Sequence, residues 1–147
     1  MINVDVPLLT HERRRVLLRE AAGVRGLVAV GVGRASGRGF QLLHRFAASC
    51  DRLDAAGINV VFVYAAESAR HVQDPLSVMA ARYRRKPSLL LDEAGLFFGR
   101  VLPVQRLRAM RFDRNMACIE TATIAVRDAD WDSLLREFLL RAQVDVA

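Results

Sequence analysis

The chain has 147 residues, 52% of them hydrophobic, and a formal net charge of +6. This length predicts a single domain over residues 1–147 that can bury a core without disulfide or metal staples. No apolar run is long enough to cross a bilayer and no secretory signal is visible, so we expect a cytoplasmic protein that does not insert in a membrane. The two cysteines, Cys50 and Cys118, are too few and too scattered for a disulfide framework or a metal knuckle.

The positive charge comes almost entirely from arginine, because Lys86 is the only lysine among 22 basic residues. Codon bias in a GC-rich genome accounts for such a composition, and phosphate or nucleic-acid contact is the functional alternative. Three basic clusters could carry that contact, at residues 13–15, 82–86 and 100–114. Acidic residues are interspersed and no aromatic residues are interleaved along a basic stripe, so the pattern disfavours nucleic acid as a partner.

The first half of the chain predicts a strand, a glycine-rich turn and a helix. Residues 1–10 look extended, and Thr10 could cap a short helix through Glu20, with a strand hairpin as the alternative. The apolar run Leu27–Val32 predicts a buried strand. An amphipathic helix follows from about Gly37 to Ala56, with one buried stripe. The stripe consists of Leu43, Phe46, Cys50 and Leu53, which makes Cys50 a small core residue rather than a nucleophile.

The middle of the chain predicts a second buried strand and a hairpin. Gly57 ends the first helix, and the apolar run 58–64 favours a strand parallel to the first. Asp74 and Pro75 read as the start of a short helix that reaches about Tyr83. Two apolar runs, 89–91 and 96–98, flank a turn near Gly95, which predicts a β-hairpin opened by Pro87.

The last third predicts one more strand and a C-terminal helix. Residues 101–117 look basic and irregular, and the alternation over 118–126 indicates a strand. Asp130 or Asp132 would cap the final helix. Its predicted buried face consists of Trp131, Leu134, Leu135, Phe138 and Leu139.

This order of elements resembles the thioredoxin-like fold, which includes thioredoxins and peroxiredoxins, over about residues 27–100. Three segments are similar to the family's Asn-Pro, Ala-x-x-Tyr and Pro-Thr-apolar strand followed by a glycine turn: Asp74-Pro75, Ala80-Ala81-Arg82-Tyr83, and Pro87 to Leu91 followed by Gly95. The opening segment is loosely similar to that of peroxiredoxins. The resemblance implies an α/β domain with a central mixed sheet flanked by helices and a C-terminal helix. It also implies a cis-proline at Pro87 beside the site.

The chain departs from the family at the redox turn. Where thioredoxins have Trp-Cys-Gly-Pro-Cys, this chain has Ala35-Ser36-Gly37-Arg38-Gly39, and the family's buried acid would fall at Val30. Disulfide exchange needs a thiolate, and a serine hydroxyl cannot replace it. We expect Ser36 to cap the following helix. We therefore predict a redox-inactive domain with no catalytic residue, no metal and no cofactor.

We predict instead that the same region binds a protein partner, as a binding or assembly module. By the resemblance, Lys86 would lie near the turn, so that three cations and a helix N-terminus could seat an anion or an acidic peptide. The predicted site consists of Arg34, Ser36, Gly37, Arg38, Lys86 and Pro87. The apolar excess also allows a homodimer, although no residue identifies its interface.

Two enzymatic alternatives stay open. One is a one-cysteine peroxidase that relies on Cys50. The other is a small NAD(P)-binding oxidoreductase, because Gly33-x-x-x-Gly37-x-Gly39 matches a dinucleotide-binding spacing and Glu67 could hold a ribose. Against the second, the chain is short, and Tyr83 and Lys86 are one residue too close for the Tyr-x-x-x-Lys motif.

Overall fold

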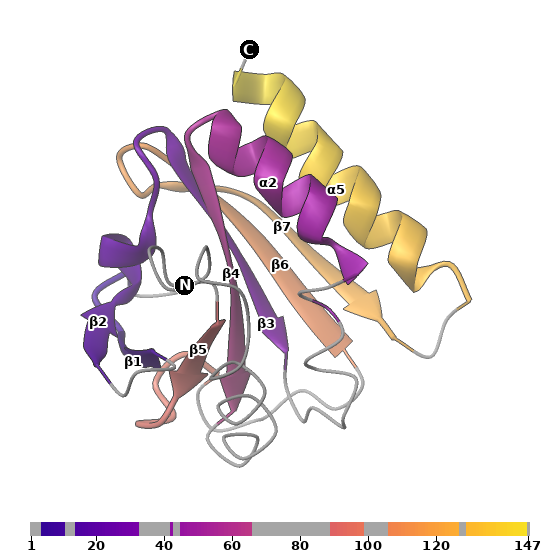
Figure 1. Cartoon of the computed structure of the whole chain (residues 1–147). Coiled ribbons are helices and arrows are strands. Elements are labelled where there is room, and N and C mark those ends of the chain that lie inside the picture. The colour runs from indigo at the N-terminus through magenta and orange to yellow at the C-terminus, as the bar shows by residue number, and fades with distance from the viewer. Residues whose placement is uncertain are drawn as a thin grey trace.

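The computed structural model describes residues 4–10, 14–32, 42, 45–65, 89–98, 106–126 and 129–146. Within them the chain forms seven strands, a short 3-10 helix (η1) and two longer helices (Figure 1). The elements are β1 (Pro7–Thr10), β2 (Arg15–Leu17), η1 (Leu18–Ala21), β3 (Gly26–Val32), α2 (Ala47–Ala55), β4 (Ile58–Ala65), β5 (Leu89–Asp92), β6 (Arg106–Asp113), β7 (Cys118–Ala125) and α5 (Trp131–Val146).

The strands form one mixed sheet. On one side the order is β2-β1-β5-β4, in which β4 and β5 are parallel and the other pairs antiparallel. On the other side the order is β3-β6-β7, all antiparallel. β3 lies along β4 and joins the two groups, and both strands end toward the bottom of Figure 1. The predicted mixed sheet with a C-terminal helix is confirmed.

Alternate residues of the central strands feed two cores on opposite faces of the sheet. Val28 and Val30 of β3 point to the face covered by α2 and α5, which run side by side (Figure 1). Leu27 and Ala29 point to the opposite face, where the N-terminal segment and Phe97 pack against them. β3 and β4 are buried along their whole length, which explains their nearly continuous apolar sequences.

Several predicted boundaries are confirmed. The first helix ends before Gly57, whose φ of +87° lies in the left-handed region that glycine tolerates. Helical hydrogen bonds reach back to the carbonyl of Leu42, and Phe46 and Leu53 are buried on the predicted stripe. Cys50 is partly buried against the same core. Residues 37–41 and the helix predicted over residues 74–83 lie outside the described residues.

The N-terminal segment forms a strand hairpin, one of the two alternatives that the sequence left open. β1 pairs with β2, and the backbone N–H of Thr10 donates to the carbonyl of Arg14 at 2.8 Å. The Thr10 hydroxyl oxygen accepts the Arg14 N–H at 3.1 Å, so Thr10 closes the hairpin rather than capping a helix. Only the single 3-10 turn η1 follows.

The predicted hairpin around Gly95 is wrong. β5 already pairs with β1 on one edge and β4 on the other, so neither edge is free for the run that follows it. Residues 93–98 form turns instead. The apolar residues of that run are used for packing against β3 rather than for a strand.

The expectation of an irregular segment over residues 101–117 is wrong for residues 106–113, which form β6. Arginines alternate with buried apolar residues at the start of this strand, which is the pattern of a half-buried strand. In α5, Leu135, Phe138 and Leu139 are buried as predicted, whereas Leu134 is 38% exposed because it lies off the buried stripe. Within the described residues, no helix combines the length and apolar character that a membrane span requires.

Candidate functional site

The candidate site is the edge of the sheet where β3 and β4 end. β6 begins at this edge, because its second residue, Leu107, pairs with Val32, the last residue of β3. The glycine-rich segment that starts at residue 33 leaves from the same point. In α/β folds, loops that leave the carboxyl ends of neighbouring strands converge there, which makes this edge the first place to look for function.

Neither cysteine belongs to the segment that directly follows β3. Residues 33–46, which follow β3, contain no cysteine. Cys50 lies inside α2 and packs against the core. Cys118 is the exposed first residue of β7, and its Sγ lies 3.8 Å from the carbonyl oxygen of Glu120, to which it donates. The two sulfurs thus belong to different elements, and neither follows β3 directly.

A buried carboxylate organises the turn after β5. The side chain of Asp92, 2% exposed, accepts the backbone N–H groups of Phe97 at 3.0 Å and Phe98 at 3.1 Å. The N–H of Gly95 donates to the carbonyl of Asp92 at 3.1 Å, with Gly95 at a φ of +72°. Asp92 therefore satisfies backbone donors inside the protein and holds the two phenylalanines in place.

The two phenylalanines pack on β3 at a position that only glycine allows. Their rings are edge to face, with centroids 5.1 Å apart. A Cβ added at Gly31 would lie 2.9 Å from Cε1 of Phe97 and 3.2 Å from Cε1 of Phe98. Gly31 therefore lets the rings approach the strand backbone. Its sequence context does not distinguish Gly31 from the glycines that follow it, because its packing partners lie more than 60 positions further along the chain.

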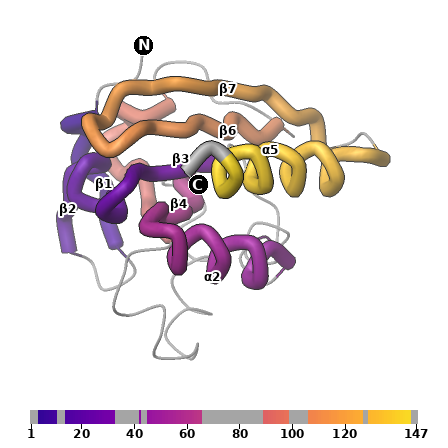
Figure 2. The backbone as a smooth tube through the Cα atoms, turned by 90° about the horizontal axis from the view of Figure 1, so that it is seen from above, coloured from indigo at the N-terminus to yellow at the C-terminus, as the bar shows by residue number. Residues whose placement is uncertain are grey.

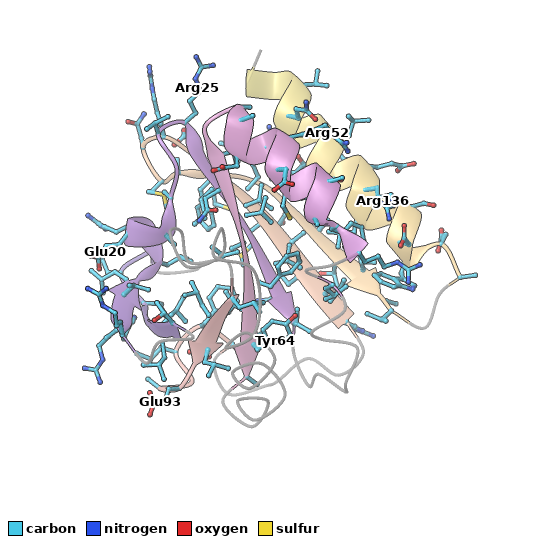
Figure 3. The ribbon with its side chains drawn as sticks, in the orientation of Figure 1. Glu20, Arg25, Arg52, Tyr64, Glu93 and Arg136 are labelled. Atoms are coloured by element: carbon cyan, nitrogen blue, oxygen red, sulfur yellow. The ribbon has the colours of Figure 1, made fainter. Side chains whose placement is uncertain are left out.

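Tyr64, near the end of β4, is fully buried (Figure 3). Burial raises the pKa of Tyr64 far above the ordinary value for a phenol, because the charged form would lose its hydration. Its hydroxyl therefore stays protonated and does not act as a base near neutral pH.

An ion cluster ties the start of α2 to the start of α5. Asp132 accepts hydrogen bonds from Nε of Arg136, at 2.6 Å, and from Nε of Arg45. Burial acts to raise the pKa of Asp132, but the hydrogen bonds and charges of the two arginines outweigh it and hold the pKa below its ordinary value. The guanidinium carbon of Arg45 lies 5.0 Å from the centroid of Trp131, and that of Arg136 lies 4.8 Å from the centroid of Phe46. Figure 3 shows Arg136 on α5.

A second ion cluster joins β6, β7 and α5 on the helix-covered face. Glu120 forms ion pairs with Nη2 of Arg111 at 3.2 Å and with Nη2 of Arg141 at 2.8 Å. It also accepts a hydrogen bond from Nε of Arg141 at 2.9 Å. These two arginines thus share one carboxylate.

Arg106 and Arg108 differ from these arginines. Both are exposed, and neither side chain makes a hydrogen bond or ion pair with another described residue. Their cross-strand neighbours on β7 are Ala125 and Thr123, and Gly31 faces Arg108 from β3. In the sequence, both belong to the predicted basic cluster 100–114, together with Arg111. The alternation of arginine with apolar residues was the signal that could have separated them from Arg111.

The residues predicted for the site lie outside the described residues. This applies to Arg34, Ser36, Gly37, Arg38, Lys86 and Pro87, so their proposed grouping stays a prediction. In the sequence, the glycine-rich segment follows β3 and Pro87 precedes β5. In the sheet, β4 lies between β3 and β5.

Comparison with known proteins identifies a fold. No family model and no curated protein sequence matches the chain. Among solved structures, peroxiredoxin Q of Xanthomonas campestris is similar with a TM-score of 0.67 and 16% identity, covering 98% of this chain and 94% of that one. Reduced Prx3 of Vibrio vulnificus has a TM-score of 0.64 and 15% identity, covering 95% and 96%. BsSco, a member of the Sco family of cytochrome c oxidase assembly proteins, has a TM-score of 0.54 and 10% identity, covering 97% and 95%.

The chain therefore has a thioredoxin-like fold, as the sequence predicted, and it lacks a Cys-x-x-Cys pair. The overall fold is similar to that of the two peroxiredoxins over 98% and 95% of this chain. The dinucleotide-binding alternative does not fit this topology. β3 has an antiparallel neighbour, β6, where a doubly wound fold needs a parallel strand.

Proposed function

We propose that this protein is a thioredoxin-like domain that binds a partner protein and performs no thiol chemistry. The observation that carries the proposal is the composition of the segment after β3. This segment contains no cysteine, while the two sulfurs belong to α2 and β7. A thioredoxin-like fold without a thiolate at this point retains a binding surface and loses the nucleophile.

The charge at the same edge favours an acidic partner. β6 brings two exposed arginines, Arg106 and Arg108, to the edge from which the arginine-containing segment 33–39 departs. Exposed guanidinium groups recognise carboxylates and phosphates through paired hydrogen bonds. One similar structure, BsSco, is described as a member of a family of assembly proteins, a role that agrees with a binding module. We place the module in the cytoplasm, where cysteines that form no disulfide, such as Cys50 and Cys118, persist as thiols.

The second candidate is a one-cysteine peroxidase that uses Cys50. The similarity to peroxiredoxin structures favours it, and Cys50 lies in the helix that follows the turn. Its partly buried position against the core opposes it, because a peroxidatic thiolate needs exposure and a positive environment.

Peroxide consumption separates the two candidates. We expect the reduced protein, supplied with dithiothreitol, to consume hydrogen peroxide and an organic hydroperoxide no faster than buffer does. Cys50→Ser and Cys118→Ser should behave like the unmodified chain. Turnover that disappears in Cys50→Ser and persists in Cys118→Ser would contradict the proposal and establish the peroxidase.

A further inference from the structure

We propose that the β6–β7 end of the sheet binds an extended acidic segment of a partner protein, which pairs with the free edge of β7 and places its carboxylates beside Arg106 and Arg108. This inference rests on the proposed binding function and names the chemistry of the partner.

The outer edge of β7 is available for pairing. β7 pairs with β6 along one edge, and no described strand pairs with the other (Figure 2). Edge strands in proteins are commonly protected by lysine, proline or an inward-pointing charge. β7 contains neither lysine nor proline, and its one acidic residue, Glu120, is engaged by Arg111 and Arg141.

Most of this edge is regular. The only register shift with β6 falls between Arg111 and Phe112, opposite the Cys118 end of β7. A bulge there leaves the six residues from Glu120 to Ala125 in continuous pairing with β6. Six regular residues are enough to template one added strand of ordinary length.

On the face away from the helices, the described residues of β6 and β7 include two charged side chains, Arg106 and Arg108, and both are positive. Arg106 and Arg108 are two positions apart on β6, so both project from one face with their Cα atoms about 6.5–7 Å apart. Their described neighbours toward this edge are the short side chains of Ala125 and Thr123 on β7. A long arginine side chain can extend over such residues toward a strand added outside β7.

The spacing between Arg106 and Arg108 matches the spacing between alternate carboxylates of an extended acidic peptide. In an added strand, alternate side chains share one face and repeat at the same 6.5–7 Å interval, so two carboxylates at alternate positions could meet the two guanidiniums. The phosphates of a nucleic acid could also meet the arginines, but a nucleic acid has no peptide N–H and C=O groups to pair with the β7 edge. The free edge therefore favours the peptide.

The experiment measures binding of a labelled nine-residue peptide that alternates glutamate and threonine, by fluorescence anisotropy. One comparison peptide has lysine in place of glutamate, and another has alternate backbone nitrogens methylated so that they cannot donate. A single-stranded oligonucleotide of similar charge is the third probe. The protein variants are the double substitution Arg106→Ala/Arg108→Ala and a control, Arg14→Ala/Arg15→Ala. The control removes the same charge at β2, the opposite edge of the sheet.

We expect the acidic peptide to bind the unmodified chain and the control alike, and its Kd to rise about fivefold or more in the Arg106→Ala/Arg108→Ala variant. The lysine peptide and the N-methylated peptide should not bind. The proposal is overturned if the Kd is unchanged by the arginine substitutions, or if backbone methylation of the peptide leaves its Kd unchanged. It is also overturned if the acidic peptide does not bind at all. If the oligonucleotide binds more tightly than the acidic peptide, and its binding depends on the same two arginines, the surface binds phosphate groups and the peptide proposal is overturned. The peroxide assay decides the proposed function independently, so a failure here with no peroxidase activity removes only this inference.

Discussion

Asp92 is a carboxylate whose role is structural although it lies at the edge where function is expected. Both of its oxygens are used by backbone donors, Phe97 N–H and Phe98 N–H, and it is almost completely buried. A buried acid at such an edge would ordinarily suggest acid–base chemistry. The hydrogen bonds assign it instead to the positioning of an aromatic pair.

We expect Asp92→Ala to lower the free energy of unfolding by about 2–4 kcal/mol, because it leaves two backbone N–H groups without their acceptor. Urea denaturation followed by circular dichroism measures the change. Asp92→Asn, which keeps one good acceptor, should lose less. Glu93→Ala, an exposed neighbour, is the matched control and should stay within about 0.5 kcal/mol. Equal stability of Asp92→Ala and the unmodified chain would contradict this role.

Gly31 is the second residue whose identity is set by packing. We expect Gly31→Ala to cost about 1–3 kcal/mol, since the new methyl group would press on the edges of the Phe97 and Phe98 rings. A double-mutant cycle with Phe97→Leu tests the cause. The smaller side chain should make Gly31→Ala less damaging, with a favourable coupling of about 1 kcal/mol. Strictly additive effects would show that the strain arises elsewhere.

At the level of elements, α5 is held to its neighbours by two carboxylates that each serve two arginines. Asp132 joins it to the start of α2, and Glu120 joins it to β6 and β7. Asp132 is the second residue of α5, so it does not take the capping role that the sequence allowed for it. The N–H of Leu134 donates to the backbone carbonyl of Asp130 at 3.0 Å at this end of the helix.

The depressed pKa of Asp132 predicts the sign of a pH effect. A carboxyl group whose pKa is lower in the folded state stabilises the protein above its unfolded pKa of about 4, and that contribution is lost as the pH falls through the folded pKa. Asp132→Asn should therefore be less stable than the unmodified chain at pH 7, by less than about 1 kcal/mol because both arginines are half exposed. The difference should shrink below pH 4. Asp130→Asn is the exposed control, and a difference that grows on acidification would contradict the assignment.

The Glu120 cluster predicts unequal effects from its members. Arg111 is largely buried, so Glu120→Gln should cost about 1–2 kcal/mol by removing the negative charge that pairs with this guanidinium. Arg141→Ala removes a half-exposed side chain and should cost less than about 0.5 kcal/mol. Thermal denaturation of the two variants compares them, and equal losses would show that burial of Arg111 is not the cause.

At the level of the whole molecule, the two faces of the sheet have different tasks. One face is closed by α2 and α5, which bury the alternate residues of β3, β6 and β7. The other is closed near β1, β4 and β5 and carries exposed arginines at the start of β6. The surface proposed for an acidic partner therefore lies beside a core that is already complete, so substitutions at Arg106 and Arg108 can alter binding without unfolding the chain.

Much of this architecture was predictable because the signals are local. Uninterrupted apolar runs predict buried strands, and they did so at β3 and β4. The helical period predicts α5, and alternation predicts β7. Two predictions were wrong because the deciding partner is distant in sequence. The run 96–98 resembles a hairpin strand, but β1 occupies the edge of β5 that it would need. The arginines of residues 106–113 made this segment look irregular, although it forms β6 by pairing with β3.

The sequence alone determined that no thiol directly follows β3, because this depends only on which residues occupy one continuous segment. It equally determined the positive charge and the arginine content. Only the tertiary structure decided that Arg111 is neutralised by Glu120 while Arg106 and Arg108 stay open, and that Gly31 receives two aromatic rings. The physical reason is that pairing between strands far apart in the chain sets which face each side chain occupies, and a local pattern does not encode the identity of the neighbour across the sheet.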